Sequence, residues 1–410
     1  MKWYNVPEVK LEVAEIKKSS TFLLLLFISL ILSGCWSKKE LNELAIVVAA
    51  GVDKIDDEYE VSVQVVAPGE ISSNKPSSGR SPVVTYHAKG KSVFEAIRRL
   101  TTVTPRKAYF AHLQVVVIGE KLATEGIDQT VDLLARDPET RNDFDVIVSY
   151  QSSAKEVLNV LTPIEKIPAN KMINSLGGTE KAWGSTVSVN IEDLVTILGN
   201  KEKSAVLSVI EIQGDTQLGM DKVNVERIKT PTLLKYAGLA IFKQDKLIGL
   251  LTEEESRSFN FLNDNIKSTV EVISCPKEGK LTTEITKSTT KIKGKFKNNT
   301  PKINVQIDID QNVGEVECAI DLTENKSIAY INKKTAELIK VQIEEALMTI
   351  QKNYQADIVG FGEVLYREDY KAWKNIKDDW SSIFPELEIK VEVNVNTSGL
   401  GTMTNLKLKE

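Results

Sequence analysis

Residues 112–119, HLQVVVIG, form an apolar run rich in β-branched side chains, which is typical of a buried strand. Helical spacing of apolar residues follows at 126–135, and a second strand-like run follows at 145–150. Ser153 and Glu156 then have the spacing of a capping box, in which the two side chains complete the hydrogen bonds of a first helical turn. Strands that alternate with helices predict a mixed α/β layer.

Two further strands are predicted upstream of this layer. Residues 45–52 are continuously apolar, whereas residues 59–65 alternate between apolar and polar. With a turn at 53–58 between them, the two runs predict a hairpin with one buried face. The Ser-, Gly- and Pro-rich stretch 68–82 predicts an exposed loop, and Ser92 predicts the start of the next helix.

The C-terminal half has a different pattern. Residues 236–251 predict a hairpin, and three or four alternating strands between 268 and 320 predict a meander with one solvent-facing side. The longest helix, 325–354, carries an apolar stripe that predicts packing across the meander, and residues 387–395 alternate as a final strand. We therefore expect an α+β (mixed α/β) fold, with an N-terminal mixed sheet and helices and a C-terminal antiparallel-rich sheet packed by a long helix.

The length of 410 residues predicts two to three domains. Residues 35–200 are expected to form an N-terminal domain, with a subdomain break near the Pro- and Gly-containing stretch 163–184. A strand and a polar linker are expected at 201–230, and a C-terminal domain at 231–405.

A lipoprotein signal is predicted near the N-terminus. A cationic pair at 17–18 precedes the uncharged run Ser19–Ile31, which ends in residues 32–35, LSGC. The apolar core is far short of the roughly 20 residues that a spanning helix needs, and it has no polar stripe to suit a buried core helix. We therefore expect residues 1–34 to be removed as a signal peptide, after alkylation of the Cys35 thiol.

The residues ahead of the signal are unusual for a cationic signal end. They include Glu8, Glu12 and Glu15, and they make this end long and acidic. We expect a translation start later than Met1.

Composition limits the classes of partner and site. The net charge of −5 is mild and no long charge block occurs, so neither nucleic acid nor a polybasic membrane patch is indicated. Apart from Cys35, the cysteines are Cys275 and Cys318, which lack the spacing of a metal site. We expect no metal, and the pair is either a disulfide or two separately buried thiols.

Few residues offer catalytic chemistry. His87 and His112 are the only histidines; His112 leads the apolar run and is favoured as a packed or hydrogen-bonded residue at a strand end. Ser152 and Lys155 match the S-x-x-K motif of penicillin-recognising enzymes, but the S-D-N and K-T-G elements are missing, and Ser153 as a helix cap explains the residues better. No phosphate-binding or nucleophile-elbow motif occurs, and no two carboxylates stand out as a glycosidase pair. We expect no catalytic residue.

Two aromatic side chains have two interpretations. Trp373 and Trp380 lie seven residues apart, a spacing that puts them on one face of a helix. The favoured alternative is a position in the core, because large aromatics are usually well buried. The functional alternative is a docking face for a partner.

Several blocks of sequence resemble the Ger(x)C family of spore germination lipoproteins. Residues 35–47, CWSKKELNELAIV, followed by GVDK at 51–54, resemble the start of the mature family members. Further matching blocks are FAHLQVVVIGE at 110–120, LARDPE at 134–139, ADIVGFGE at 356–363 and YKAWKNIK at 370–377. The resemblance covers essentially everything after Cys35; the chain departs from the family in its extended N-terminus and in Ser37, at a position often acidic in relatives.

The resemblance implies a non-enzymatic C subunit of a nutrient germinant receptor with a three-domain mixed α/β architecture. It implies a lipid anchor on the outer face of the spore inner membrane, a membrane-embedded A subunit, and a B subunit similar to amino-acid transporters. Cys35 is the residue carried over: it would bear a diacylglyceryl group, with or without an N-acyl chain, and no other cofactor is expected. Trp36, Lys39 and Glu40, beside the lipid site, are expected near the membrane as candidate docking residues.

We therefore interpret the chain as a membrane-tethered receptor subunit that acts in receptor assembly and germination signalling. A substrate-binding lipoprotein of a transporter is the first alternative, and it would show two parallel α/β lobes with a ligand cleft. A lipid-anchored hydrolase is the second, and it would show a nucleophile beside a base.

Overall fold

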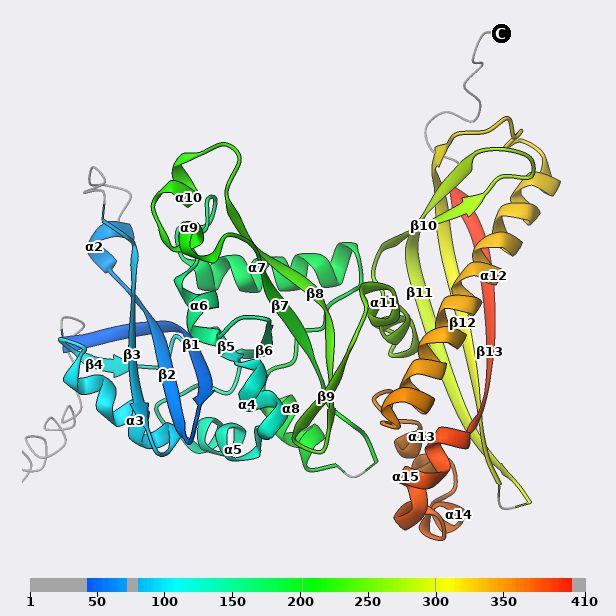
Figure 1. Cartoon of the computed structure of the whole chain (residues 1–410). Coiled ribbons are helices and arrows are strands. Elements are labelled where there is room, and N and C mark those ends of the chain that lie inside the picture. Colours follow the sequence, from blue (N-terminus) through cyan, green and yellow to red (C-terminus); the bar gives the residue numbers. More distant parts are fainter. Residues whose placement is uncertain (1–42, 72–79, 201, 299, 400–410) are drawn as a thin grey trace, which may run out of the picture. The chain divides into compact units, whose positions relative to one another are not determined.

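Four parallel strands form the centre of the larger of two sheets (Figure 1). The computed structural model describes residues 43–71, 80–200, 202–298 and 300–399. Within them, the parallel strands are neighbours in the order β1 (Leu44–Ile55), β5 (Val115–Ile118), β6 (Asp145–Tyr150) and β7 (Val206–Gly214).

Antiparallel strands extend this sheet at both edges. On one side β1 pairs with β2 (Glu58–Val66), β2 pairs with β3 (Val83–Gly90), and the short β4 (Lys107–Tyr109) pairs with β1. On the other side β7 pairs with β8 (Thr232–Lys243), and β8 with β9 (Lys246–Leu251). The predicted hairpin of β1 and β2 is confirmed, but β1 is buried on both faces rather than one.

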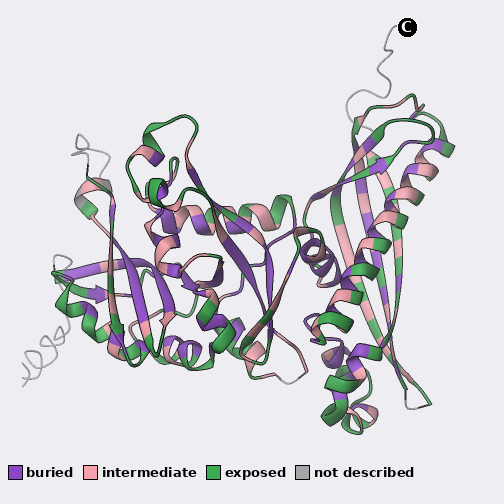
Figure 2. Ribbon diagram, in the orientation of Figure 1, coloured by how far each residue is buried: buried purple, intermediate pink, exposed green. Residues whose placement is uncertain are grey.

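Helices cover both faces of the large sheet, which is why its central strands are predominantly apolar. In β5, Val116 and Ile118 pack in one core cluster with helices α3, α4, α5 and α8, whereas Val115 and Val117 pack in another with α6 and α7. Figure 2 shows the resulting concentration of buried residues in the strands. The bounds are α3 Val93–Arg99, α4 Glu120–Glu125, α5 Asp128–Arg136, α6 Ala154–Asn159, α7 Pro168–Ala182 and α8 Ile191–Leu198, with the short α2 at Pro68–Ile71.

The segment predicted as a linker to the second domain has another role. Residues 215–231 form an excursion that carries α9 (Thr216–Met220) and α10 (Val223–Glu226) between the paired strands β7 and β8. Strands β8 and β9, expected to open the C-terminal domain, therefore belong to the large sheet. The polar composition of the excursion reflects its exposure, because the chain leaves the sheet and returns to the same edge.

The second sheet confirms the predicted meander. Strands β10 (Thr269–Ser274), β11 (Lys280–Lys297) and β12 (Thr300–Val316) are antiparallel, and β13 (Glu388–Gly399) pairs in parallel with β12. Burial alternates along β12, which gives the sheet one wet face. The long helix α12 (Asn325–Met348) continues as a π-helical turn at Thr349–Tyr354, and its apolar stripe is buried at Ile331, Thr335, Ile339, Ile343, Leu347 and Ile350.

Two groups of helices complete the fold. Helices α13 (Phe361–Glu368), α14 (Tyr370–Lys374) and α15 (Trp380–Ile383) connect α12 to β13. Helix α11 (Glu253–Leu262) lies between β9 and β10, begins at a Thr252–Glu255 capping box, and is buried continuously from Ser256 to Leu262. The expected α+β fold class is confirmed. In the part of the chain that the structure describes, no helix has the length and apolarity of a membrane span.

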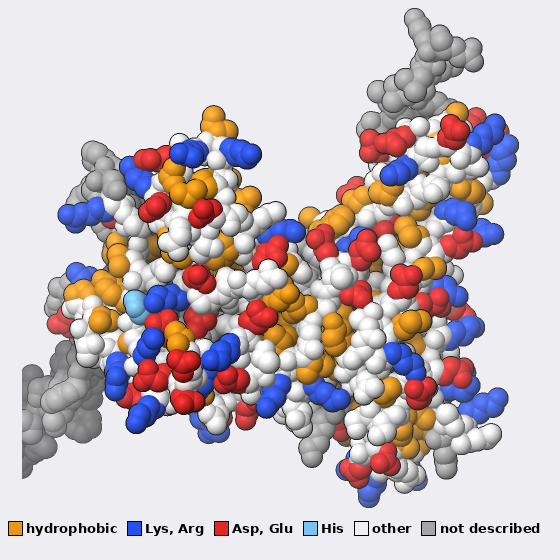
Figure 3. Space-filling view, in the orientation of Figure 1, with side chains coloured by type: hydrophobic (Ala, Val, Ile, Leu, Met, Phe, Trp, Pro, Cys, Tyr) orange, Lys and Arg blue, Asp and Glu red, His pale blue; other side chains and the backbone are white. Residues whose placement is uncertain are grey.

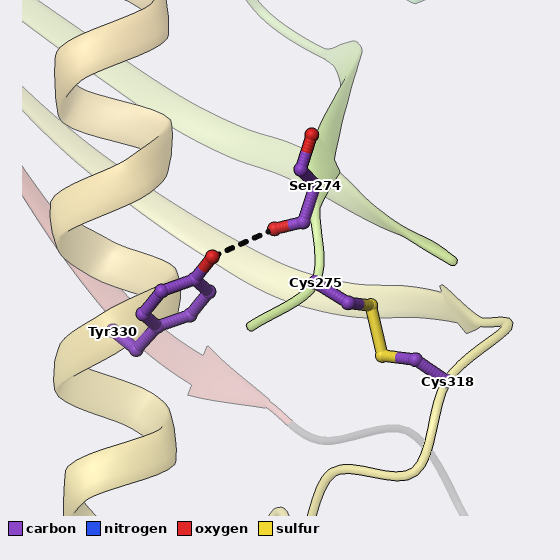
Figure 4. Close-up of a disulfide and its surroundings, with 4 residues drawn as sticks. All are labelled: Ser274, Cys275, Cys318 and Tyr330. Atoms are coloured by element: carbon purple, nitrogen blue, oxygen red, sulfur yellow. Dashed lines mark hydrogen bonds between the residues drawn. A yellow bond between two sulfur atoms is a disulfide. The ribbon is translucent and has the colours of Figure 1, made fainter. Parts of the chain in front are cut away.

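A disulfide joins Cys275, which follows β10, to Cys318, which follows β12 (Figure 4). The two Cα atoms are 6.4 Å apart, and 43 residues separate the cysteines in sequence. Beside it, the Tyr330 hydroxyl of α12 donates to the Ser274 carbonyl at 3.1 Å. The alternative of two separate thiols is therefore excluded, and the bond ties the end of the small sheet together.

Loss of this disulfide should destabilise the protein. Closing a loop of this length restricts the unfolded chain, so Cys275→Ser/Cys318→Ser should lower the free energy of unfolding by about 2–4 kcal/mol. Denaturant unfolding with and without reductant measures the effect. The wild type should lose stability in reductant and the double variant should not; equal stability of the oxidised wild type and the variant would contradict the prediction.

Candidate functional site

The residues expected to attach the chain to a membrane or to dock beside it, Cys35, Trp36, Lys39 and Glu40, lie outside the described residues. The description begins at Glu43, which is eight residues after Cys35. A fully extended chain of eight residues spans at most about 29 Å. A lipid on Cys35 would therefore keep Glu43, the residue before β1, within about 29 Å of the lipid-bearing residue.

A cavity of about 500 Å³ opens at the amino ends of the parallel strands. Its walls include Ile46 of β1 and the exposed His112, which lies in the turn before β5 rather than in the strand itself. Arg141, also in the wall, pairs with Asp143 at 2.6 Å, so its guanidinium is already matched by a neighbouring carboxylate. The cavity wall thus mixes apolar side chains, such as Ile46 and Ile173, with charged groups, of which Arg141 and Asp143 are already paired.

The chemistry of a hydrolase is not assembled in this cavity. Ser188 Oγ donates to Asp145 Oδ1 at 2.5 Å, so the hydroxyl contacts the carboxylate directly. Burial raises the pKa of Asp145, and the negative charge of Asp193 raises it further against the lowering effect of Ser188. The ring of His112 lies edge-on to the ring of Tyr109, at 6.0 Å between centroids. In a Ser–His hydrolase the serine hydroxyl donates to a histidine, whereas Ser188 donates to Asp145.

At the opposite, carboxyl ends of the strands, a protein side chain fills the position where α/β folds often bind anionic ligands. The buried Asp53, at the end of β1, accepts hydrogen bonds from the backbone N–H groups of Ala154 and Lys155, at 2.8 and 3.0 Å. These groups belong to the first turn of α6. A Cβ on Gly119, after β5, would lie 2.2 Å from Asp53 Oδ1, so glycine is needed there. The chain's own carboxylate therefore occupies the anion-binding helix end.

The S-x-x-K match is confirmed as part of a helix cap. Ser153 Oγ accepts from the Glu156 N–H, and the Glu156 carboxylate accepts from the Ser153 N–H, which completes the capping box. Lys155 Nζ lies 3.4 Å from Glu60 Oε1, and Ser152 Oγ bonds weakly to the Tyr150 carbonyl. Ser152 and the Lys155 amine therefore bond to different partners, and Ser153 is the serine that caps α6.

Removal of the Asp53 carboxylate should destabilise this end of the sheet. In Asp53→Ala, two N–H groups at the start of α6 lose their buried acceptor, and we expect a loss of about 2 kcal/mol or more. Asp57→Ala, in the exposed turn after β1, is the matched control and should change stability by less than about 0.5 kcal/mol. Denaturant unfolding compares them, and equal losses would contradict the assigned role of Asp53.

Trp373 and Trp380 are core residues. Their relative exposures are 1% and 5%, and their rings pack edge to face with centroids 5.1 Å apart. The favoured interpretation, a position in the core, is therefore confirmed and the docking face is wrong, because the separate short helices α14 and α15 turn both rings inward. Gly362 lies against them, since a Cβ there would be 3.0 Å from both indoles.

A buried carboxylate that the sequence analysis did not single out organises this cluster. Asp357 accepts hydrogen bonds from the N–H groups of Gly360, Phe361 and Gly362, at 2.8, 3.0 and 2.8 Å, and from Trp380 Nε1 at 3.3 Å. Burial raises the pKa of Asp357 to about 6, although these donors act in the lowering direction. Asp53 and Asp357 both fall in blocks that resemble the Ger(x)C family, and that resemblance was the available signal.

The raised pKa of Asp357 predicts the sign of a pH effect. The folded protein holds the Asp357 proton more tightly than the unfolded chain, so this contribution to stability is present below about pH 4 and is lost as the pH rises through about 6. The stability advantage of the wild type over Asp357→Asn should therefore narrow by up to about 3 kcal/mol between pH 4 and 8. Unfolding curves across this range test it, and an advantage that widens with pH would contradict it.

Two family models match the chain. The model described as "Spore germination protein N-terminal domain" matches residues 37–212, and the model described as "Spore germination B3/ GerAC like, C-terminal" matches residues 237–401. The gap between them contains the excursion that carries α9 and α10 and the start of β8.

Relatives match over nearly their whole length. "Spore germination protein KC" of Bacillus subtilis (strain 168) is 32% identical over 403 residues, which cover 94% of this chain and 97% of the relative. "Spore germination protein B3" of the same organism is 24% identical over 394 residues, which cover 94% of this chain and 99% of the relative.

A solved structure has the same fold. The structure described as "Crystal Structure of the GerBC protein" matches with a TM-score of 0.55 and 19% identity, over 85% of this chain and 96% of that chain. Together, the family models and the relative at 32% identity establish the membership that the sequence blocks suggested. The chain belongs to the Ger(x)C family of spore germination proteins.

Proposed function

We propose that this chain is the lipid-anchored C subunit of a nutrient germinant receptor, and that it acts in receptor assembly and germination signalling without catalysing a reaction. Its partners would be membrane-embedded A and B subunits. Its place would be the outer face of the spore inner membrane, with Cys35 as the lipid site. The observation that carries the proposal is membership of a family of spore germination proteins together with the LSGC signal at 32–35.

Three structural observations support this proposal. Asp53 occupies the helix end where a catalytic or transport α/β domain would hold an anion. Asp145 and His112 line one cavity, and the Ser188 hydroxyl donates to the Asp145 carboxylate rather than to a histidine. The Cys275–Cys318 disulfide suits a location outside the reducing cytosol.

The alternative of a transporter's substrate-binding lipoprotein fits less well. Such a protein would present two similar parallel lobes with a cleft between them. The two sheets described here differ in kind: one has a parallel centre, and the other is an antiparallel meander with one parallel edge strand. No observation on the described residues favours this alternative over a receptor subunit.

Loss of lipidation should separate the subunit from its membrane. We expect a chain with Cys35→Ala, and with residues 1–34 replaced by a secretion signal that is cleaved without lipidation, to leave the membrane fraction and to slow nutrient-triggered germination. Two acyl chains contribute about 0.8 kcal/mol per buried methylene, and their loss removes nearly all membrane affinity. Quantitative membrane fractionation and germination kinetics measure the two effects.

Cys275→Ala/Cys318→Ala with the native signal is the matched control, since it removes two other cysteines and leaves the lipid site. This control should stay with the membrane. Full retention and normal germination of the Cys35→Ala chain would contradict the proposal.

A further inference from the structure

The excursion between β7 and β8, residues 215–231, exposes apolar side chains at its surface. Ile228 is fully exposed at a relative exposure of 109%, and Leu218 and Val225 are exposed on α9 and α10. Ile164, in the loop after α6, has a relative exposure of 94%. The Leu161 N–H of this loop donates to the Gly219 carbonyl at 2.9 Å, so the loop and the excursion lie side by side. We call the excursion and residues 161–166 together the apolar tip.

Buried hydrogen bonds hold the apolar tip together. Asn224 has a relative exposure of 0%, and its side-chain NH₂ group donates to the carbonyls of Leu161 and Thr232, at 2.7 and 3.2 Å. Its Oδ1 accepts from the Thr230 hydroxyl and from the Thr232 N–H, both at 2.9 Å. At the base, the Asp215 carboxylate caps α9. The buried side chain at the centre of the tip is therefore a fully hydrogen-bonded asparagine, whereas isoleucines are exposed to solvent. Polar residues are usually exposed and isoleucines are usually buried, so the tip reverses this distribution.

Basic side chains flank the exposed isoleucines. Arg227 and Lys229 are exposed on either side of Ile228, and Lys166 is exposed two residues after Ile164. Figure 3 shows hydrophobic side chains over α9 and α10 with Lys and Arg side chains beside them and acidic side chains nearby, and Lys222 pairs with Glu226 at 2.8 Å. An exposed aliphatic side chain between cations matches the interface of an anionic bilayer, where the aliphatic group enters the headgroup boundary and the cations meet phosphates.

We propose that the apolar tip is a second membrane contact, in which Ile228 and Ile164 insert into the headgroup region of an anionic lipid bilayer and Arg227 and Lys229 bind lipid phosphates. The inference rests on the proposed lipid anchor. A lipid on Cys35 would lie at most about 29 Å of extended chain from Glu43, which keeps the folded protein at the bilayer surface and makes a weak second contact effective. Figure 1 shows that the chain carrying α9 and α10 projects beyond the paired strands β7 and β8. A projecting loop suits shallow insertion into a headgroup layer.

The test places a fluorescent label on the tip of the full, lipidated chain in phosphatidylglycerol vesicles. Ile228→Cys and Ile164→Cys each create one reactive thiol, because Cys275 and Cys318 are joined and Cys35 carries lipid. We expect quenchers attached to the lipid to quench both labels at least about threefold more than the same label at Val341→Cys, an exposed position on α12. Quenching no greater than at Val341 would overturn the proposal.

A charge variant tests the lipid phosphates. Arg227→Gln/Lys229→Gln should reduce insertion of the label at Ile164 roughly tenfold, and phosphatidylcholine vesicles should have a similar effect on the unaltered tip. Lys293→Gln/Lys295→Gln, two exposed lysines of β11, is the control with the same loss of charge and should leave insertion unchanged. Equal effects of the two charge variants would overturn the assignment of Arg227 and Lys229.

Separate measurements test the proposed lipid anchor and the proposed membrane contact of the tip. Flotation of the chain with vesicles, together with the intact mass at Cys35, reports the anchor, whereas quenching reports the tip. A floating, lipidated chain whose tip labels stay unquenched contradicts the tip and leaves the proposed function standing. Labels at Ile228 that are shielded in spore membranes but not in pure lipid vesicles would assign the tip to a protein partner and overturn the proposal.

Discussion

Helix α11 is the element on which both sheets depend, because it has no solvent-facing side from Ser256 to Leu262. Arg257 forms a buried ion pair with Glu271 of β10, and its guanidinium lies 4.6 Å from the centroid of the Trp183 ring. Asn260 donates to the carbonyls of Gly184 and Thr186, at 2.8 and 3.0 Å. Asn260 thus joins α11 to the segment after α7, and Arg257 joins α11 to the small sheet.

The buried ion pair between Arg257 and Glu271 is important for the stability of the described fold. Burial raises the pKa of Glu271, whereas the charge of Arg257 and the hydrogen bond from Gln342 act in the lowering direction. Breaking such a pair by removing one partner leaves a buried charge uncompensated and is strongly destabilising. Apolar residues of both sheets, such as Val116 and Ile307, belong to one core cluster, so the two sheets share one core.

Much of this fold was predictable from local patterns. The β1–β2 hairpin, the caps at Ser153 and Thr252, the meander and the stripe of α12 follow from side-chain period and capping chemistry, which depend on neighbours in sequence. The assignment of β8 and β9 to the large sheet was not predictable, because strand pairing across the excursion at 215–231 is a long-range property. The docking role suggested for Trp373 and Trp380 was wrong for a related reason: their spacing specifies a face only if one helix continues through both residues.

The candidate site was less accessible to sequence reasoning than the fold. Asp53 and Asp357 act through backbone N–H groups that only the folded chain brings to them, and no spacing of residue types encodes that. The central claim is that a lipid on Cys35 tethers a non-catalytic domain, and mass spectrometry of the N-terminal peptide from spore membranes tests it most directly. We expect a mature chain that begins at Cys35 with a diacylglyceryl group on its sulfur. A membrane-derived chain with an unmodified Cys35 would contradict it.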